Sequence, residues 1–340
     1  MIASRDKTTT RKSKTKKTRR TPIDWKSYNR ELVKRGKNIA NALKSLKSYN
    51  EDEELEMMNK CKNGSPFVYT DRFIILLVII KVITGLSYRI IEGLGSLFSD
   101  KVISYSQLCR RTNKMPQAII DNINRKVTKA ITKAIDTIDV IMDGTGIMVN
   151  NTYVWVDEKT NTARRRNWKK LHFVIDRKSK AILFLEVMDK NKNEAENENM
   201  RDTMLDALEN IDDDISITRA FGDGLYDSND NFDMFDQAGI ELVTRIREPT
   251  VNIAKSKTNS SIISDWELRR FKANLRNRIA IKQIDWKRYV KEHQYGLRGG
   301  VEGFIGAFKR LFREYAYSKK DENIVTEFKF KQLTWNIMRL

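Results

Sequence analysis

Apolar residues recur at helical spacing over the first third of the chain. Within residues 23–133, leucine, isoleucine and valine return at intervals near 3.6 residues, and glycine and proline are scarce. The run Asp71–Ile83 is almost wholly apolar and predicts a buried helix, capped by Thr70 or by Asp71 itself. We therefore predict a helical region over residues 23–133.

Helices and turns alternate in this region in the outline of a helix-turn-helix. A turn at Gly85 leads into a short amphipathic helix, and a further helix is expected over Ser104–Asn113. A helix, a glycine-containing turn and a second helix are typical of this DNA-binding motif. In that interpretation Arg110 and Arg111 contact DNA. Many helical bundles share the outline, so a bundle without DNA contact is the alternative.

Beyond residue 136 the pattern changes to short β-branched and apolar runs. These runs predict strands over residues 137–143, 153–157, 171–176, 181–188, 215–221 and 240–246. Helical patterns occur over residues 194–209, 231–238 and 295–315. A meander followed by alternating helices and strands is typical of an α/β sheet with a mixed edge. The order is compatible with a ribonuclease-H-like (RNase H-like) core over residues 134–340.

The size and composition of the chain indicate a globular protein of more than one domain. It has 340 residues, 40% of them hydrophobic, and only four prolines. The longest apolar run, Phe73 to Ile80, is followed by Lys81 and is far shorter than the roughly 20 residues of a spanning helix. No apolar stretch follows the first charges, so no secretory signal is expected. We expect a soluble, intracellular protein without a membrane partner.

Charge narrows the choice of partner. Lys and Arg number 64 against 45 Asp and Glu, a formal net charge of +19, which favours a polyanion and nucleic acid before an anionic membrane. Residues 1–22 hold nine of the basic residues and one aspartate. We expect this tail to be disordered in isolation and to bind phosphates, with a solubilising tail as the alternative.

Metal chemistry in this chain has to depend on carboxylates. Two cysteines and two histidines exclude a disulfide scaffold and a His-rich metal site. Asp143 is expected to end the first strand, Asp223 to end a later strand between two glycines, and Glu302 to lie on the last long helix. Such oxygen-only sites suit Mg²⁺ or Mn²⁺.

Each of these acids also has an ordinary structural interpretation. An aspartate at a strand end is often a turn residue or a helix cap, and a lone helical glutamate is usually solvated. Asp139, Asp157 and Asp227 are rivals for the same roles.

The last predicted helix, over residues 295–315, can be examined by angle. At 100° per residue, Tyr295, Arg298, Glu302 and Lys309 fall within a stripe about 60° wide if the helix is continuous. Glycines are frequent around Glu302, and each costs a helix about 1 kcal/mol relative to alanine. The alternative is a helix that begins near Gly300.

Several motifs together resemble one family. The spacing Tyr295-x2-Arg298-x3-Glu302-x6-Lys309 is similar to the Y-R-E-K signature of DDE transposases from prokaryotic insertion sequences of the insertion-sequence-5 and insertion-sequence-4 type. The further blocks that resemble this family are, in its order, residues 143–146, 165–176, 222–227, 327–329 and 333–336. The likeness covers about residues 65–340.

The resemblance implies a fold, a site and cofactors. It implies an α/β, RNase H-like catalytic core, a mixed sheet flanked by helices, after an α-helical DNA-binding region. It implies that Asp143, Asp223 and Glu302 hold two Mg²⁺ or Mn²⁺ ions. Tyr295, Arg298 and Lys309 would then contact phosphates at the transposon ends. From the residues themselves, Arg166, Lys169 and Lys170 form a basic run that is either a phosphate track or a solvated face.

The implied function is transposition. The enzyme would bind the terminal inverted repeats of its element, cut the DNA at the ends, and join the 3′-OH strand to target DNA. A homodimer pairing two DNA ends, in the cytoplasm of a prokaryote and associated with the nucleoid, is expected. The alternatives are an RNase H-like nuclease or resolvase without strand transfer, and an inactive, domesticated DNA-binding protein.

Overall fold

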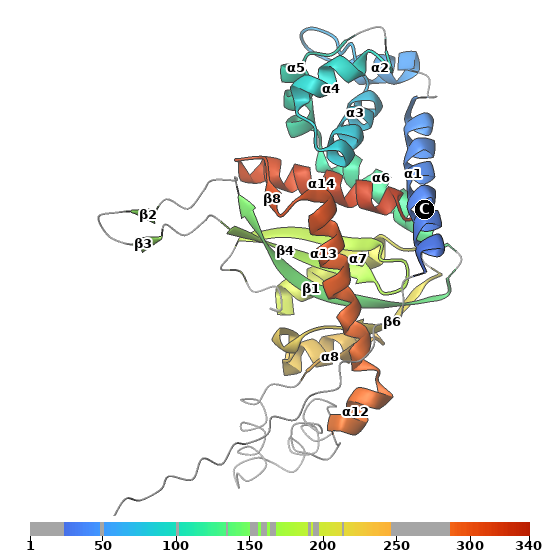
Figure 1. Ribbon diagram of the computed structural model, residues 1–340, viewed down its shortest axis with the longest axis vertical. Helices are drawn as coiled ribbons and strands as arrows, with labels where there is room; N and C mark the ends of the chain where they lie inside the picture. Colours follow the sequence, from blue (N-terminus) through green and yellow to red (C-terminus); the bar gives the residue numbers. More distant parts are fainter. Residues whose placement is uncertain are drawn as a thin grey trace, which may run out of the picture.

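The computed structural model shows a group of N-terminal helices above a central sheet, with further helices against the sheet itself (Figure 1). It describes residues 24–47, 51–99, 102–133, 135–149, 156–157, 162–163, 168–189, 192, 197–212, 214–245 and 286–340. The predicted tail over residues 1–22 and part of the basic run, including Arg166, lie outside these residues. Within the described ranges, no helix is both long and apolar enough to cross a membrane.

Six helices make up the first part of the chain, as the apolar pattern predicted. They are α1 (Trp25–Lys47), α2 (Glu51–Asn59), α3 (Asp71–Thr84), α4 (Tyr88–Gly95), α5 (Tyr105–Lys114) and α6 (Gln117–Thr132). Thr70 caps α3, and its hydroxyl accepts a hydrogen bond from the Phe73 amide at 3.1 Å. Gly85 ends α3 in the left-handed conformation, which glycine adopts without strain.

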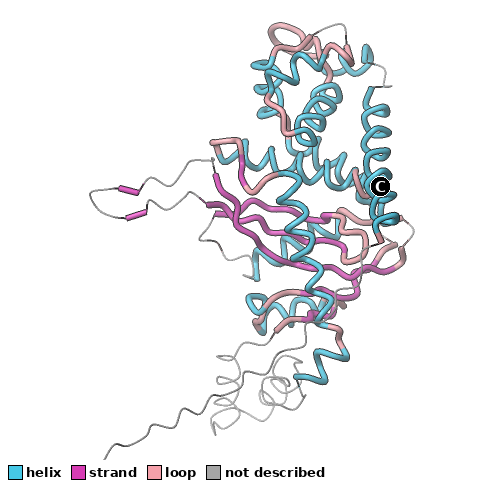
Figure 2. Tube along the Cα trace, in the orientation of Figure 1, coloured by secondary structure: helices cyan, strands magenta, loops and turns pink. Residues whose placement is uncertain are grey.

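Helix α3 is the apolar centre of this helical region. Its residues from Phe73 to Ile79 are buried, and they pack with Ile91 of α4 and Leu108 of α5. The same cluster includes residues of α14 (Asp321–Ile337) at the far end of the chain. The C-terminal helix therefore closes the core of the N-terminal helices, as the tube in Figure 2 also shows.

The sheet has the strand order β5-β4-β1-β6-β7, and β8 pairs with the end of β1. The strands are β1 (Thr137–Val149), β4 (Trp168–Asp176), β5 (Ile182–Asp189), β6 (Ser216–Phe221), β7 (Glu241–Val243) and β8 (Tyr315–Ala316). β1, β4 and β5 form an antiparallel meander, whereas β6 and β8 run parallel to β1 and β7 runs parallel to β6. A three-strand meander extended by parallel strands is the RNase H-like order, so that prediction is confirmed. Strands β2 (Val156–Asp157) and β3 (Thr162–Ala163) pair separately.

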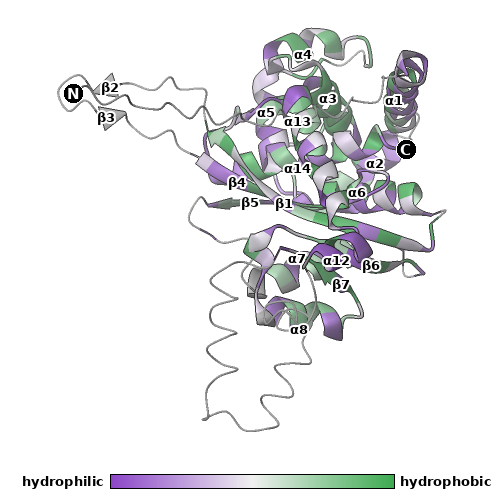
Figure 3. Cartoon of the chain, turned by 60° about the horizontal axis from the view of Figure 1, so that its bottom comes forward, coloured by the Kyte–Doolittle hydropathy of each residue, from purple (hydrophilic) through white to green (hydrophobic). Residues whose placement is uncertain are grey.

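Helices cover both faces of the sheet (Figure 3). They are α7 (Asn197–Glu209), α8 (Asn229–Gln237), α12 (Trp286–Glu292) and α13 (Gly300–Phe312), together with α14 and the 3₁₀ turns η1 (Gly224–Tyr226) and η2 (Tyr295–Gly299). Val140 and Met142 of β1 pack toward α7 and α8, whereas Ile141 packs toward α13 and α14. This alternation along one strand separates the two layers of the core.

Two expected boundaries are wrong. Strand β1 does not end at Asp143 but continues to Val149, because β4 pairs with it beyond that point, as far as Met148. The expected helix over residues 295–315 is not continuous either. Residues Tyr295–Gly299 form a 3₁₀ turn, and the α-helix begins at Gly300, the alternative that the glycines favoured.

Candidate active site

Asp143 and Asp223 reach the same level of two neighbouring parallel strands. Strand β6 ends at Phe221, which is opposite Ile141, and each aspartate follows two residues later. Asp223 keeps an extended backbone, with φ −84° and ψ −174°. Ile141 and Phe221 belong to the core under α13. Because alternate residues of an extended chain share a face, both aspartates are directed to the α13 side.

Asp143 is partly open to solvent and lies beside a guanidinium. Its side chain is 15% exposed. Oδ1 accepts a hydrogen bond from the Gly144 amide at 2.9 Å, and Oδ2 lies 3.3 Å from Nη2 of Arg298. Nε of Arg298 is buried and has no hydrogen-bond partner within the described part of the chain. One N–H group of the Arg298 guanidinium therefore makes no hydrogen bond to the described part of the protein at this edge of the sheet.

Asp223 is fixed by a tight turn. Its side chain caps η1 and accepts a hydrogen bond from the Leu225 amide at 2.8 Å, while its carbonyl accepts one from the Thr244 hydroxyl. A Cβ atom on Gly222 would lie 2.6 Å from the ring of Tyr226, so only glycine fits there. The Tyr226 hydroxyl lies 2.9 Å from Nε2 of buried His172.

Sequence reasoning missed Tyr226 and Thr244 as supports of this turn. Neither belongs to a charged or metal-binding motif, and their contacts depend on the tertiary structure. His172 is a buried residue of β4.

Tyr295 lies in the electrostatic field of both aspartates. Burial raises the pKa of its hydroxyl, the negative charges of Asp223 and Asp143 act in the same direction, and Arg298 and Arg245 oppose them. Tyr295 belongs to η2, which packs against β6. Four of the predicted site residues, the two aspartates with Tyr295 and Arg298, therefore gather at one edge of the sheet.

Glu302 lies in the first turn of α13 and is exposed. The helix starts beside the sheet, since a Cβ atom on Gly300 would lie 3.9 Å from Cδ1 of Ile141 and 2.9 Å from Nζ of Lys180. Glu302 and Lys309 are about two helical turns apart and share a face. Among the described residues, no three acidic, His or Cys side chains are placed to hold a metal ion. The structure therefore brings together the two aspartates but not a complete three-carboxylate cluster.

The two described lysines of the basic run, Lys169 and Lys170 of β4, both have partners within the protein. Lys169 is 12% exposed and pairs with Asp189 at 2.6 Å and with Asp321 at 2.9 Å. Burial opposes its charge, but the hydrogen bonds to the two aspartates hold the pKa of Lys169 above its ordinary value. Nζ of Lys170 donates to the Lys192 carbonyl at 2.8 Å. Both lysines have partners within the protein, which favours the structural interpretation of this run, and their contact with phosphate stays a prediction.

The two predicted arginines of α5 also differ. Arg111 is mostly buried, pairs with Asp71 at 2.6 Å and donates to the Tyr69 carbonyl at 2.9 Å. It therefore holds the start of α3, and its contact with DNA stays a prediction. Arg110 is exposed and remains a candidate contact.

Asp139 and Asp227, two of the rival carboxylates, are buried within the protein. Asp139 accepts hydrogen bonds from Thr218, Arg177 and Arg219 at 2.8 to 3.0 Å. Burial works against its charge, but these donors hold the pKa of Asp139 below its ordinary value. Asp227 is buried, with 1% of its surface exposed. The side chain of Asp157 lies outside the described residues.

The residues at this edge fit a divalent cation only in part. Two carboxylates on neighbouring strands, both within reach of solvent, suit Mg²⁺ or Mn²⁺, which keep several waters and take few protein ligands. Glu302 would have to approach them to complete the set.

Comparisons with known proteins match this chain to one family model and to several solved structures. A family model described as the transposase DDE domain matches residues 136–337. Similar solved structures include a strand transfer complex of the Drosophila P element transposase, with 8% identity, 88% of this chain and 71% of that chain covered, and a TM-score of 0.30. The Mos1 strand transfer complex has 8% identity, 71% and 80% coverage, and a TM-score of 0.24. A Mos1 mariner paired end complex with Mn has 11% identity, 75% and 83% coverage, and a TM-score of 0.23. At TM-scores this low, the three structures carry no argument about this chain.

Proposed function

Because this chain belongs to the DDE transposase family, we propose that it cuts DNA at the ends of an insertion sequence and joins the freed 3′-OH strand to target DNA. The observation that carries the proposal is the placement of Asp143 and Asp223 at one level of two parallel strands, beside Tyr295 and Arg298. The Y-R-E-K spacing supports a prokaryotic element of the insertion-sequence-5 and insertion-sequence-4 type.

Asp143, Asp223 and Glu302 are the metal ligands in this proposal. A pair of Mg²⁺ or Mn²⁺ ions, when bound there, supplies Lewis acidity for the attacking and leaving oxygens. The carboxylates of Asp143 and Asp223 are already directed to the α13 side, and Glu302 lies at the start of that helix. Glu302 has to approach the two aspartates to complete the set.

The cationic and phenolic groups position the DNA. Phosphoryl transfer depends mainly on positioning and on neutralising charge. The Arg298 side chain lies beside Asp143 and is partly exposed, so its guanidinium can donate to a phosphate oxygen. Lys309 shares the Glu302 face of α13. The charges of both aspartates and of Arg245 act on the pKa of the Tyr295 hydroxyl, which therefore lies near all three. We assign all three to the phosphates at the cut end.

Binding of the terminal inverted repeats is assigned to the helical part, residues 23–133, with exposed Arg110 as a contact. The basic tail over residues 1–22 adds phosphate contacts, and residues 134–340 form the catalytic unit. Two copies paired on two DNA ends, at the nucleoid of a prokaryotic cell, complete the proposal.

The test is a cleavage and joining assay with linear DNA that carries the element's own ends. If the ends are unknown, inverted repeats are sought in the DNA that flanks the gene. With Mg²⁺ or Mn²⁺, the wild-type protein should yield both cut ends and joined product, and chelation should abolish both. Cut ends without joined product would indicate a nuclease or resolvase. Binding to the ends without cutting would indicate an inactive DNA-binding protein.

A further inference from the structure

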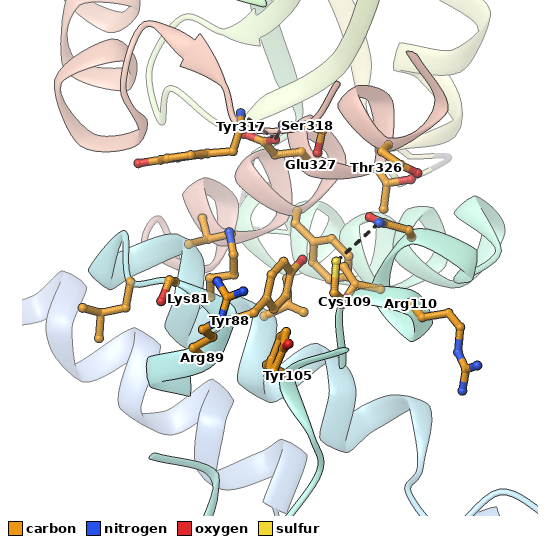
Figure 4. Close-up of a pocket in the computed structure, with 18 of the residues that line it drawn as sticks. Lys81, Tyr88, Arg89, Tyr105, Cys109, Arg110, Tyr317, Ser318, Thr326 and Glu327 are labelled. Atoms are coloured by element: carbon orange, nitrogen blue, oxygen red, sulfur yellow. Dashed lines mark hydrogen bonds between the residues drawn. The ribbon is translucent and has the colours of Figure 1, made fainter. Parts of the chain in front are cut away.

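A cavity of about 710 Å³ lies between the N-terminal helices and the C-terminal segment, away from the aspartates. Helices α3, α4 and α5 form one wall, and the residues after β8 together with α14 form the other (Figure 4). Strand β8 pairs with β1 at Met148, which is about 16 Å along the strand from Asp143. The cavity is therefore separate from the candidate active site.

Aromatic rings and cations alternate around this cavity. The ammonium of Lys81 lies 4.7 Å from the ring centre of Tyr88 and 5.4 Å from that of Tyr317. The guanidinium of Arg89 lies 4.7 Å from the ring centre of Tyr105. Tyr105 and Tyr317 are 41% and 49% exposed, so their rings can accept another planar group. In Figure 4 these side chains come from opposite walls of the same space.

The acid in the cavity wall is already neutralised. Glu327 pairs with Lys331 at 2.8 Å and accepts hydrogen bonds from the amides of Tyr317 and Ser318, both at 3.0 Å. Lys81, in contrast, forms no ion pair with any other described residue, only its contacts with the two rings. Burial lowers the pKa of Lys81, and the more distant charge of Glu327 opposes this shift. An anion bound beside Lys81 and Arg89 would relieve the cost of these charges.

We propose that this cavity binds a nucleotide, with the base stacked on the tyrosine rings and the phosphate on Lys81 and Arg89. Its volume lies in the range of small-ligand sites, roughly 300 to 1,000 Å³. Bases stack on aromatic side chains without regard to sequence, and arginine adds cation–π contact. An unpaired nucleotide of a DNA strand and a free nucleotide have the same chemistry, and the experiment separates these two sources.

Cys109 lines the cavity and makes binding measurable without catalysis. The chain has one other cysteine, the exposed Cys61. In full-length protein carrying Cys61→Ser, the rate of Cys109 modification by a thiol reagent is measured with chelator present. The probes are dAMP, a single-stranded oligonucleotide, the same oligonucleotide without bases, and a blunt duplex.

The single-stranded oligonucleotide should protect Cys109 several-fold, and the abasic and duplex forms should not. Protection by dAMP as well would identify a site for free nucleotides, whereas protection by the oligonucleotide alone would identify a site for a DNA strand. Equal protection by the abasic strand, protection by duplex alone, or no protection by any probe would overturn the proposal.

Variants assign the contacts. Tyr105→Ala and Tyr317→Ala should each raise the ligand concentration needed for half-maximal protection about tenfold. Lys81→Gln should raise this concentration for phosphate-bearing ligands. Lys114→Gln removes the same charge from the exposed end of α5 and is the matched control. Unchanged protection in both tyrosine variants would contradict the proposal. Asp143→Asn should leave protection intact, so failure here and failure of the proposed catalysis are distinguishable.

Discussion

Strand β1 carries two aspartates four residues apart whose surroundings differ. Asp139 is 9% exposed and accepts hydrogen bonds from two arginines and a threonine at 3.0 Å or less. Asp143 is more exposed, accepts the amide of its own neighbour Gly144, and has Arg298 at the longer distance of 3.3 Å. The first carboxylate is held in a complete set of donors, and the second faces an edge open to solvent.

The difference separates a structural carboxylate from a reactive one. A buried charge is tolerated when partners replace its water, and removing one partner leaves the others uncompensated. A carboxylate that is to bind a metal must instead keep lone pairs within reach of solvent. Asp143 meets this condition and has Asp223 at the same level of the next strand. The comparison therefore favours Asp143 for chemistry and Asp139 for stability.

The largest expected effect is on activity, from Asp143→Asn or Asp223→Asn. Each should lower DNA cleavage about a thousandfold or more, equal to roughly 4 kcal/mol of transition-state stabilisation. Stability should change less than in Asp139→Asn, because Asp143 lies 3.3 Å from Arg298 whereas Asp139 has closer ion pairs with two arginines. Cleavage rates and thermal unfolding of the same preparations check both parts. Substantial cleavage by folded Asp143→Asn would contradict the assignment of Asp143 to catalysis.

The next effect is on stability, from Asp139→Asn. Arg177 and Arg219 would lose their shared carboxylate, and the free energy of unfolding should fall by about 3 kcal/mol. Urea unfolding measures this change. Asp143→Asn is the matched control on the same strand, and an equal loss in both variants would contradict the assignment.

Gly222→Ala tests the turn that holds Asp223. The added Cβ would lie 2.6 Å from the Tyr226 ring, so the ring and its contact with His172 must shift. We expect a loss of about 2 kcal/mol in unfolding free energy, and lower cleavage because Asp223 moves with the turn. Gly93→Ala is the control, because an added Cβ there meets no atom within 4 Å and the backbone has no positive φ. No effect of Gly222→Ala on cleavage would show that the turn does not position Asp223.

The pH dependence of unfolding should show the stabilising role of Asp139. The pKa of Asp139 is lower in the folded protein than in the unfolded chain, so its stabilising contribution is complete above the ordinary aspartate pKa of about 4. That contribution is lost as the pH falls through the folded-state pKa. Unfolding titrations below pH 5 should show a steeper acid loss in the wild type than in Asp139→Asn. Parallel curves would indicate that the ion pairs do not act in this way.

The smallest effect concerns two lysines and DNA affinity. Lys309→Gln should reduce the slope of log affinity against log salt by about one, as expected for one lost phosphate contact. Lys169→Gln should leave that slope unchanged, because Asp189 and Asp321 already hold its charge. Fluorescence anisotropy with end DNA at several salt concentrations checks both. A reduced slope for Lys169→Gln would indicate that Lys169 contacts a DNA phosphate and would support the phosphate-track interpretation.

Local pattern predicted much of the fold and part of the site. Periodicity located helices such as α3, with its Thr70 cap, and the succession of strands and helices was compatible with the sheet that the structure shows. The alignment of Asp143 with Asp223 required the structure, because β1 continues past Asp143 and the parallel pairing with β6 sets the level of both aspartates. The break at Gly299–Gly300 was signalled by the glycines but required the structure to settle.

What sequence alone could not predict depends on contacts between distant residues. The ion pair of Lys169 with Asp321, at the start of α14, could not be read from the basic run around it. The ion pair of Arg111 with Asp71, forty residues earlier, is another contact that the local pattern does not predict. The extension of β1 past Asp143 depends on β4, whose pairing overrides the turn tendency of Gly144 and Gly146. In each case long-range pairing decided the outcome over a local signal.

The most direct test of the central claim compares Asp143→Asn and Asp139→Asn in one cleavage and joining assay with Mg²⁺. The assay uses the element's own ends at a temperature where both variants are folded by circular dichroism. We expect Asp143→Asn to bind the DNA but neither cut nor join it, and Asp139→Asn to keep wild-type activity per folded molecule. Cleavage by Asp143→Asn at a rate near that of the wild type would contradict the account.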